Sequence, residues 1–452
     1  MTLETELFHD TMLGECRLDS SRNGALLLQP ATGATLLVSR ELGARIAGGS
    51  RAPELLRVLA SRGFALGGTL CAAVPKTADP RFFMVDLTRA CSNRCSYCFR
   101  QLRQTEHIDD EMLDCIIDKI IGYCRESGFT RISLQAWGGE PLLAWDSIRW
   151  MQDTLRGASI DARILIETNG VSVTPAIARE MYARGILCSV SIDGPASVHD
   201  CNRLLMGGGG SHAAALRGFK LLRAAGYGRQ IGAVCVVTRG SLSCLPEIVA
   251  YFASGLKLPR VKMNIVKDSP GMRDKSLCLT SDDVARFWRT LLHELTELNR
   301  QGVSFGESTV VGLLHNLTTH RPVSFCHSRG CQSGYRMLSF GMEGGVYPCD
   351  LTDYPEMRLG DVRLAEGLAD MVSRRAASHP FLSMTLPAAC AVCPWRVFCG
   401  GGCTSMRLQG GGGDSDPADC IRNRTLYPLL IELILNEPQI VSSLTGGEVV
   451  IA

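Results

Sequence analysis

The 452-residue chain has no marked excess of charge of either sign. Lys and Arg together number 47, Asp and Glu 45, and the formal net charge is +2 at pH 7. Proteins that hold nucleic acid or an anionic membrane electrostatically carry a clear basic excess, so this composition argues against both partners. No stretch reaches the roughly 18 uninterrupted apolar residues of a membrane-spanning helix. The first thirty residues contain no basic segment that leads into an apolar run, so we expect no signal peptide and a cytoplasmic location.

Disulfides are not expected in a cytoplasmic chain, yet the sequence contains 20 cysteines. Clustered cysteines in such a chain indicate metal binding, and eleven of them fall into two patterned groups. The other nine occur singly, and we expect them to be buried as small hydrophobic residues. These are Cys16, Cys71, Cys115, Cys124, Cys188, Cys201, Cys235, Cys244 and Cys278.

The length predicts two or three domains. Residues 1–75 form the first, in which two short apolar runs around a turn predict a hairpin and two amphipathic stretches follow. The runs are Leu26–Leu28 and Leu36–Val38, the amphipathic stretches are Arg40–Ile46 and Pro53–Arg62, and the segment Leu70–Pro80 has the prolines of a linker.

In residues 81–310 strand and helix patterns alternate six times, which predicts an α/β fold with a parallel sheet and outer helices. The expected strands are Arg81–Leu87, Thr130–Gln135, Arg163–Glu167, Ile186–Ser191, Ile231–Val237 and Arg260–Ile265. Six such units suit a partial (β/α)6 TIM barrel. In barrels the chemistry gathers in the loops after the strand carboxyl ends.

Residues 320–440 differ in composition, because glycine, proline and cysteine are frequent there. Helical periodicity returns only at Leu426–Leu435. So irregular a region needs another source of stability, which metal clusters could supply. Two glycine runs, Gly207–Gly210 and Gly410–Gly413, are predicted to be mobile loops.

The first cysteine group, in the segment CSNRCSYCFR, follows the first expected barrel strand. Cys91, Cys95 and Cys98 can hold one cubane iron–sulfur cluster and leave its fourth iron without a protein ligand. A structural zinc site is the alternative, but it needs four ligands, and no suitably spaced fourth one is present.

The Cys-x3-Cys-x2-Cys pattern, followed by Phe99, resembles the signature of the radical S-adenosylmethionine (SAM) superfamily. The resemblance implies a [4Fe–4S] cluster whose open iron binds the amino and carboxyl groups of SAM. One electron from the cluster then cleaves the sulfonium, and the 5′-deoxyadenosyl radical takes a hydrogen atom from the substrate.

Further matches follow the next three expected strands. The segment Trp137–Pro141 resembles the family's GGE motif at the cofactor's amino group, and the segments at Thr168 and Ser191 resemble those near its ribose and carboxylate. The implied cofactor contacts are Phe99, Gly138, Gly139, Glu140, Thr168, Asn169, Ser191, Asp193 and Arg203. The alternative for Asn169 and Asp193 is a turn residue that bonds its own backbone.

The second cysteine group resembles the SPASM extension, which implies two auxiliary [4Fe–4S] clusters. By analogy with sulfatase maturases, one would use Cys326, Cys331, Cys349 and Cys403, and the other Cys390, Cys393, Cys399 and Cys420. The Cys326–Cys331 spacing is one residue short, so an open iron at that cluster is an alternative, as is a pair of zinc knuckles. Asp350 matches a residue thought to take a substrate proton, although a solvated loop acid would look the same.

Residues 18–66 resemble, more weakly, the winged-helix-like recognition element of ribosomal-peptide maturases. That element captures a leader peptide by adding it as a strand to a sheet edge. A dimerisation or packing domain is the alternative.

These features predict a maturase that modifies a ribosomally made precursor peptide, most simply by a carbon–carbon or thioether crosslink. The auxiliary clusters would accept the electron left after bond formation, and flavodoxin or ferredoxin would be the donor for the first cluster. The alternatives are a sulfatase maturase that makes formylglycine and a zinc-knuckle interaction protein.

Overall fold

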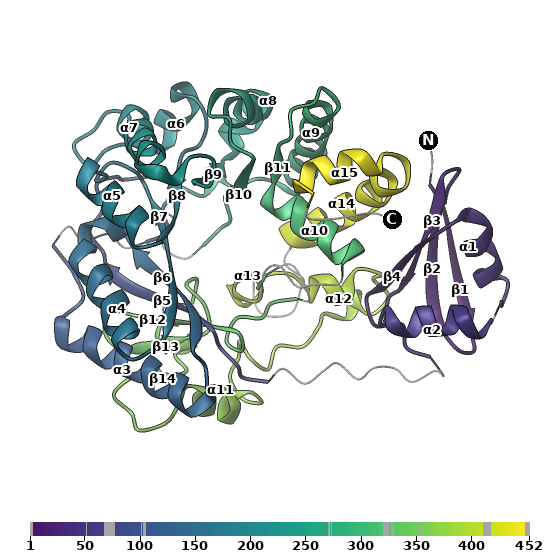
Figure 1. Cartoon of the computed structure of the whole chain (residues 1–452), viewed down its shortest axis with the longest axis horizontal. Helices are drawn as coiled ribbons and strands as arrows, with labels where there is room; N and C mark the ends of the chain where they lie inside the picture. Colours follow the sequence, from purple (N-terminus) through teal and green to yellow (C-terminus); the bar gives the residue numbers. More distant parts are fainter. Residues whose placement is uncertain are drawn as a thin grey trace.

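The computed structural model describes residues 3–50, 52–66, 77–100, 102, 105–269, 272, 274–319, 325–326, 330–352, 354–409 and 417–447. Two sheets organise these residues: a four-stranded antiparallel sheet near the N-terminus and a ten-stranded mixed sheet (Figure 1). No helix in these ranges is long and apolar enough to cross a membrane.

The N-terminal sheet is a meander followed by two helices. Its strands, in spatial order, are β1 (Glu4–Asp10), β2 (Gly14–Ser21), β3 (Gly24–Gln29) and β4 (Ala34–Val38), and the helices are α1 (Arg40–Ala47) and α2 (Pro53–Ser61). The predicted hairpin is β3–β4, and the amphipathic stretches are the two helices. Strands β1 and β2 were not predicted, because they alternate charged and small polar residues with few β-branched ones. The winged-helix-like description stays a prediction.

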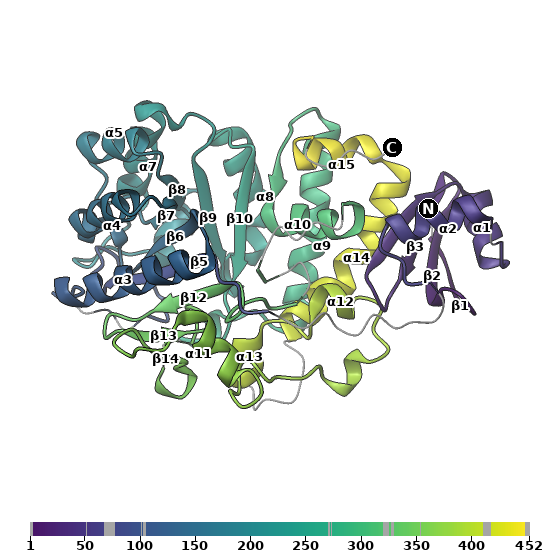
Figure 2. The ribbon, with the colours of Figure 1, turned by 60° about the horizontal axis from the view of Figure 1, so that its bottom comes forward.

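The N-terminal sheet packs against the C-terminal helices. Leu26 and Leu28 of β3 belong to the large hydrophobic core, beside helix α14 (Pro417–Asn436), and the two views in Figures 1 and 2 agree on this placement. The Thr35 hydroxyl donates a 2.6 Å hydrogen bond to the Leu317 carbonyl. The sheet is therefore anchored to the rest of the chain by both apolar and polar contacts.

The ten-stranded sheet contains all six predicted strands, and they are parallel. They are β5 (Phe82–Thr88), β6 (Arg131–Gly138), β7 (Asp161–Thr168), β8 (Leu187–Ser191), β9 (Gly232–Val237) and β10 (Arg260–Ile265). Strand β11 (Gly306–Glu307) extends the sheet beyond β10. On the other side, β12 (Met337–Phe340) runs parallel to β5, and β13 (Gly345–Tyr347) and β14 (Gly360–Asp361) follow antiparallel. The result is a mixed α/β fold around a parallel sheet.

Helices line the outer side of the parallel strands (Figure 1). They are α3 (Asp110–Ser127), α4 (Trp145–Gly157), α5 (Pro175–Ala183), α6 (Ala196–Asn202), α7 (His212–Leu222) and α8 (Leu245–Ala250). The later helices are α9 (Ser281–Arg300), α10 (Ser308–Thr318), α11 (Leu368–Arg375), α12 (Arg396–Cys399), α13 (Thr404–Gln409), α14 and α15 (Pro438–Thr445). The predicted helix at Leu426–Leu435 is the second half of α14.

The single cysteines are mostly, but not all, buried. Cys16, Cys124, Cys188 and Cys235 are buried, and Cys244 and Cys278 partly so. The prediction was wrong for Cys115 and Cys201, which are exposed on helices α3 and α6, where only one face of an amphipathic helix reaches the core. Cys71 lies outside the described residues, as do most of the expected linker and all of Gly410–Gly413.

The mobility expected for the Gly207–Gly210 run stays a prediction. The run forms a turn in which the Leu205 N–H donates to the Gly209 carbonyl at 3.0 Å. A Cβ on Gly210 would lie 2.1 Å from Asp200 Cγ, so a larger residue there would require the Asp200 carboxylate to move.

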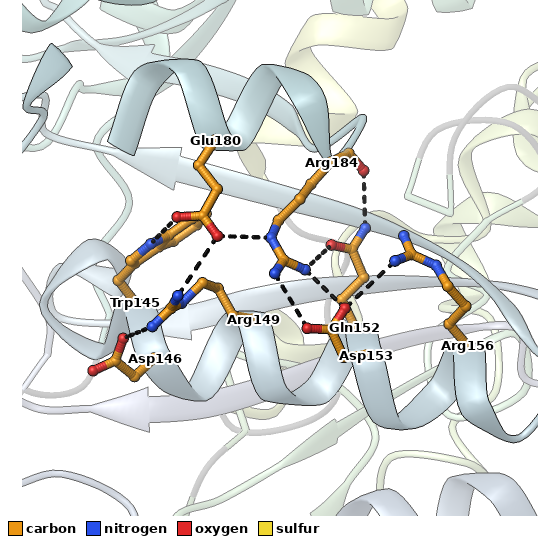
Figure 3. Close-up of polar contacts among 8 residues, drawn as sticks. All are labelled: Trp145, Asp146, Arg149, Gln152, Asp153, Arg156, Glu180 and Arg184. Carbon is orange, nitrogen blue, oxygen red and sulfur yellow. Dashed lines mark hydrogen bonds and ion pairs between the residues drawn. The ribbon is translucent and has the colours of Figure 1, made fainter. Parts of the chain in front are cut away.

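A network of charged side chains joins α4 to α5 on the outer surface (Figure 3). Arg184 donates to Asp153 at 2.8 Å and to Glu180 at 3.0 Å. These hydrogen bonds from Arg184 are the main reason that the pKa values of Asp153 and Glu180 lie below their ordinary values of 3.8 and 4.5. A carboxylate with a lowered pKa contributes stability above its ordinary pKa and loses it as the pH falls through the lowered value.

Replacing Arg184 with Ala is therefore expected to lower stability at pH 6 by at most about 1 kcal/mol, because the Asp153 and Glu180 side chains are 51% and 35% exposed and solvent screens the ion pairs. The difference from wild type should shrink towards pH 3. Urea unfolding midpoints of both proteins at the two pH values measure it, with Arg179→Ala, at an exposed arginine of α5, as control. A difference that stays the same at both pH values would contradict the ion-pair explanation.

Candidate cofactor and metal site

The first cysteine group lies directly after β5, at the carboxyl end of the parallel strands. Cys91 is buried, and Cys95 and Cys98 are partly buried. The pKa of Cys91 is raised to about 12, mainly by burial, and the nearby Glu140, Cys95 and Cys98 contribute to the rise. The three thiols are thus electrostatic neighbours in one partly buried loop, where a cationic cluster would relieve their mutual repulsion on ionisation. Among the described residues, their side chains do not converge in a geometry that could hold a metal ion. This donor set fits an iron–sulfur cluster held by three cysteines.

The GGE turn after β6 is seated against the chain that leads into the cysteines. The Gly139 N–H donates to the Thr88 carbonyl at 2.7 Å, and the Glu140 N–H donates to the Ala90 carbonyl at 2.8 Å. A Cβ on Gly138 or Gly139 would lie 2.3 Å from one of these carbonyl oxygens. The glycines are therefore needed for contact with the backbone of residues 88–90.

The carboxylate of Glu140 is buried and joins two loops. It accepts hydrogen bonds from the Thr168 hydroxyl at 2.6 Å, the Asn169 N–H at 2.7 Å and the Leu142 N–H at 3.2 Å. Burial raises its pKa, and these hydrogen bonds oppose the rise. Glu140 thus ties the turn after β6 to the end of β7, and its contact with the amino group of SAM stays a prediction.

Asn169 combines the two roles that its sequence context left open. Its side-chain oxygen accepts from the Val171 N–H at 2.9 Å, which is the turn interpretation. Its Nδ2 donates to the Ser92 hydroxyl at 2.9 Å and lies 3.6 Å from the Cys91 sulfur. The turn therefore places the Asn169 amide against the cysteine loop.

Asp193 and Arg203 lie together after β8, beside the second cysteine. Asp193 Oδ2 accepts from Arg203 Nε at 3.0 Å and from the Tyr97 hydroxyl at 2.5 Å. Burial raises the pKa of Cys95 to about 11, while the charge of Arg203 lowers it. Tyr97 was missed by sequence reasoning, although an aromatic residue between Cys95 and Cys98 was a signal for it. Phe99 and Ser191, also predicted to contact the cofactor, are half-buried nearby in the chain.

The second cysteine group separates into two neighbourhoods. Burial raises the pKa of Cys326, and the nearby Cys331, Cys403 and Asp350 contribute to the rise. The pKa of Cys349 is also raised by burial, and Cys403 and Cys331 contribute there too. Cys390 has Cys393 and Cys420 as its charged neighbours. These neighbours agree with part of each set that the resemblance implied.

Cys399, expected in the second set, has Asp419 as its nearest anionic neighbour. Among the described residues, no three His, Cys, Asp or Glu side chains converge in a geometry that could hold a metal ion. The ligand sets therefore stay predictions, which the proximity of the thiols supports.

Asp350 is half-buried and accepts from the Cys349 thiol at 3.1 Å. Burial raises its pKa, while Lys262 and Arg100 lower it. A carboxyl group in this setting is not the freely solvated loop acid of the alternative interpretation. Whether it takes a substrate proton stays a prediction.

The inner face of the parallel sheet carries an ion pair that the sequence did not predict. Lys262 of β10 lies 3.7 Å from Glu167 of β7. The two strands are three positions apart in the sheet, about 14 Å if it were flat, so the side chains meet because the sheet curves. Glu167 is the main reason that the pKa of Lys262 is raised, and Cys326 and Asp350 contribute. Charged side chains thus extend from the barrel strands to the second cysteine group.

A curved parallel sheet with three neighbouring thiols after its first strand is the arrangement that the resemblance to the radical SAM superfamily implied. Residues 85–241 match the family model of the Radical SAM superfamily, so the chain contains a radical SAM domain.

Three similar proteins show how far the likeness extends. The cysteine-type anaerobic sulfatase-maturating enzyme of Clostridium perfringens (strain 13 / Type A) is 23% identical over 341 residues, which is 70% of this chain and 86% of that protein. The structure of native anSMEcpe with bound AdoMet matches with a TM-score of 0.67 at 19% identity and covers 79% of this chain and 100% of the other. That of Streptococcus suis SuiB bound to precursor peptide SuiA matches with a TM-score of 0.57 at 13% identity, covering 91% and 99%. At these identities the two structures show the fold.

Proposed function

We propose that this chain is a radical SAM maturase that modifies a ribosomally made peptide and forms a carbon–carbon or thioether crosslink. The observation that carries the proposal is that Cys91, Cys95 and Cys98 are buried or partly buried electrostatic neighbours in the loop at the carboxyl end of the parallel strands. SAM, bound at that cluster, supplies the 5′-deoxyadenosyl radical that takes a hydrogen atom from the substrate. The chain's own part is to hold the cluster and to orient the peptide in a site that excludes water.

Three regions divide this work in the proposal. Residues 1–75 recognise the peptide, residues 81–310 form the radical SAM barrel, and residues 320–440 form a SPASM domain with two auxiliary [4Fe–4S] clusters. The two neighbourhoods of thiols around Cys403 and Cys390 support this division. Auxiliary clusters held by these cysteines would supply an acceptor for the electron left after bond formation, and a flavodoxin or ferredoxin would supply electrons to the first cluster.

The open edge of β1 is the proposed binding site for the leader peptide. The sheet has two edge strands, but β4 lies against α10 through the Thr35–Leu317 hydrogen bond. Strand β1 exposes most of its side chains, including Leu7 at 73%. An exposed edge offers backbone hydrogen bonds to an extended peptide, and exposed apolar side chains add contact area. SuiB, which has a similar fold, is solved with its precursor peptide bound.

Replacing Leu7 with Asp is expected to raise KM for a leader-bearing peptide about tenfold, because the variant lacks the apolar contact between Leu7 and the added strand. Both kcat and the cleavage of SAM without peptide should stay unchanged. Leu364→Asp, at a 50% exposed leucine after β14, is the matched control. Equal KM values for wild type and Leu7→Asp would contradict leader binding at the β1 edge.

Sulfatase maturation is the second candidate, and the Cys349–Asp350 contact together with the Clostridium perfringens relative favours it. Incubating the reconstituted protein with a precursor peptide and, separately, with a sulfatase peptide that carries the target cysteine or serine distinguishes the two. A crosslink removes two hydrogens from a leader-bearing peptide, whereas formylglycine appears only in the sulfatase peptide. Zinc in place of iron in the anaerobically purified protein would contradict both and favour the interaction protein.

A further inference from the structure

A buried hydrogen-bond chain connects the loop after β8 to the first cysteine group. His199 is completely buried, and its Nδ1 accepts from the Asp193 N–H at 3.2 Å. The proton of the neutral ring is therefore on Nε2, which donates to the Ser211 hydroxyl oxygen at 2.9 Å. Burial lowers the pKa of His199 to about 3, so the ring stays neutral at physiological pH.

The same chain fixes the orientation of the Asn93 amide. The Ser211 hydroxyl donates its hydrogen to the Arg203 carbonyl at 2.7 Å, so it can only accept from Asn93. Asn93 accordingly points its Nδ2 at Ser211, at 3.0 Å. Its oxygen must face away from Ser211, because a flipped amide would set two acceptors against each other.

The side-chain oxygen of Asn93 is unusual because it is buried without a hydrogen-bond partner among the described residues. Asn93 is 1% exposed, and the oxygen is its Oδ1. Buried amide oxygens are almost always paired in folded proteins. Asn93 stands between Cys91 and Cys95, and its own N–H points to the Cys91 sulfur at 3.4 Å. The unsatisfied acceptor thus lies within the loop that carries the three thiols.

We infer that Asn93 is a cofactor-binding residue whose side-chain oxygen accepts an N–H from the amino group of SAM, with Ser211 and His199 as the positioning residues. Glu140, the expected acceptor for that group, already accepts three hydrogen bonds from its own chain. Asn93 offers an acceptor that is unsatisfied and held in place. The inference rests on the cofactor part of the proposed function and is independent of the peptide substrate.

The test compares two ligands of the iron-loaded protein, SAM and 5′-methylthioadenosine, which lacks the amino acid part. Asn93→Leu keeps the volume of the side chain and removes the acceptor. Anaerobic equilibrium dialysis should give a Kd for SAM about tenfold weaker than wild type, with the Kd for 5′-methylthioadenosine within about twofold. Unchanged SAM affinity, or equal losses for both ligands, would overturn the inference.

Ser211→Ala provides a second variant outside the cysteine loop, in case Asn93→Leu lowers the iron content. It frees the Asn93 amide without removing its oxygen, so the loss should again be selective for SAM but smaller, about threefold. A loss shared by 5′-methylthioadenosine, or no loss, would overturn the positioning role and with it the inference. A wild-type protein that binds no SAM would instead contradict the proposed function itself.

Discussion

Simultaneous replacement of Cys91, Cys95 and Cys98 with Ala is expected to abolish SAM cleavage while about eight of about twelve irons remain. The physical reason is that these thiols are neighbours in the loop after β5, where Cys95 and Cys98 raise the pKa of Cys91 and where Arg203 and Asp193 act on Cys95. In the proposed function, the cysteines of the second group hold two other clusters. Iron analysis and detection of 5′-deoxyadenosine in reduced, oxygen-free protein measure both parts. Cys115→Ala, an exposed cysteine on α3, is the control and should keep all iron and all cleavage.

Loss of all iron from the triple variant would show that the clusters do not form at separate sites. Retention of SAM cleavage by the triple variant would contradict the proposed function at its base, because it would place the SAM-binding cluster elsewhere in the chain.

The second large effect concerns the two neighbourhoods of the second cysteine group. Replacing Cys331 or Cys403 with Ala should each remove about four irons, and replacing both should remove no more, because both thiols serve one cluster. Combining Cys331→Ala with Cys393→Ala should remove about eight. Each variant should still cleave SAM but lose peptide turnover, since the electron left after bond formation has no acceptor.

Iron content, cleavage and product mass are measured on the same preparations, and the exposed Cys201→Ala protein is the control. If the Cys331/Cys403 double variant lost about eight irons, the proposed partition of ligands would be contradicted.

The barrel strands could be predicted because their signal is local. Buried parallel strands such as β5 and β9 read as apolar runs, and helices with one apolar face separate them. The motif-bearing loops could then be placed at the strand ends, where the structure brings Glu140, Asn169 and Asp193 to the cysteine loop. Spacing in the sequence was enough for this, since parallel strands all end at the same side of a sheet.

What could not be predicted depends on contacts between distant residues. The Lys262–Glu167 pair requires the curvature of the sheet, which no local pattern encodes. The need for glycine at position 139 comes from the Ala90 carbonyl. Strand β1 carries few apolar residues because its edge and much of its surface are exposed, so its sequence resembles a loop.

Spectroscopy with labelled cofactor tests the central claim most directly. Reduced protein is mixed with SAM carrying 15N in its amino group, and electron–nuclear double resonance is recorded on the cluster signal. A 15N coupling that disappears in the Cys91/Cys95/Cys98 variant is the predicted result, because three thiolates leave one iron free to bind that nitrogen. A cluster signal without such a coupling would contradict the account.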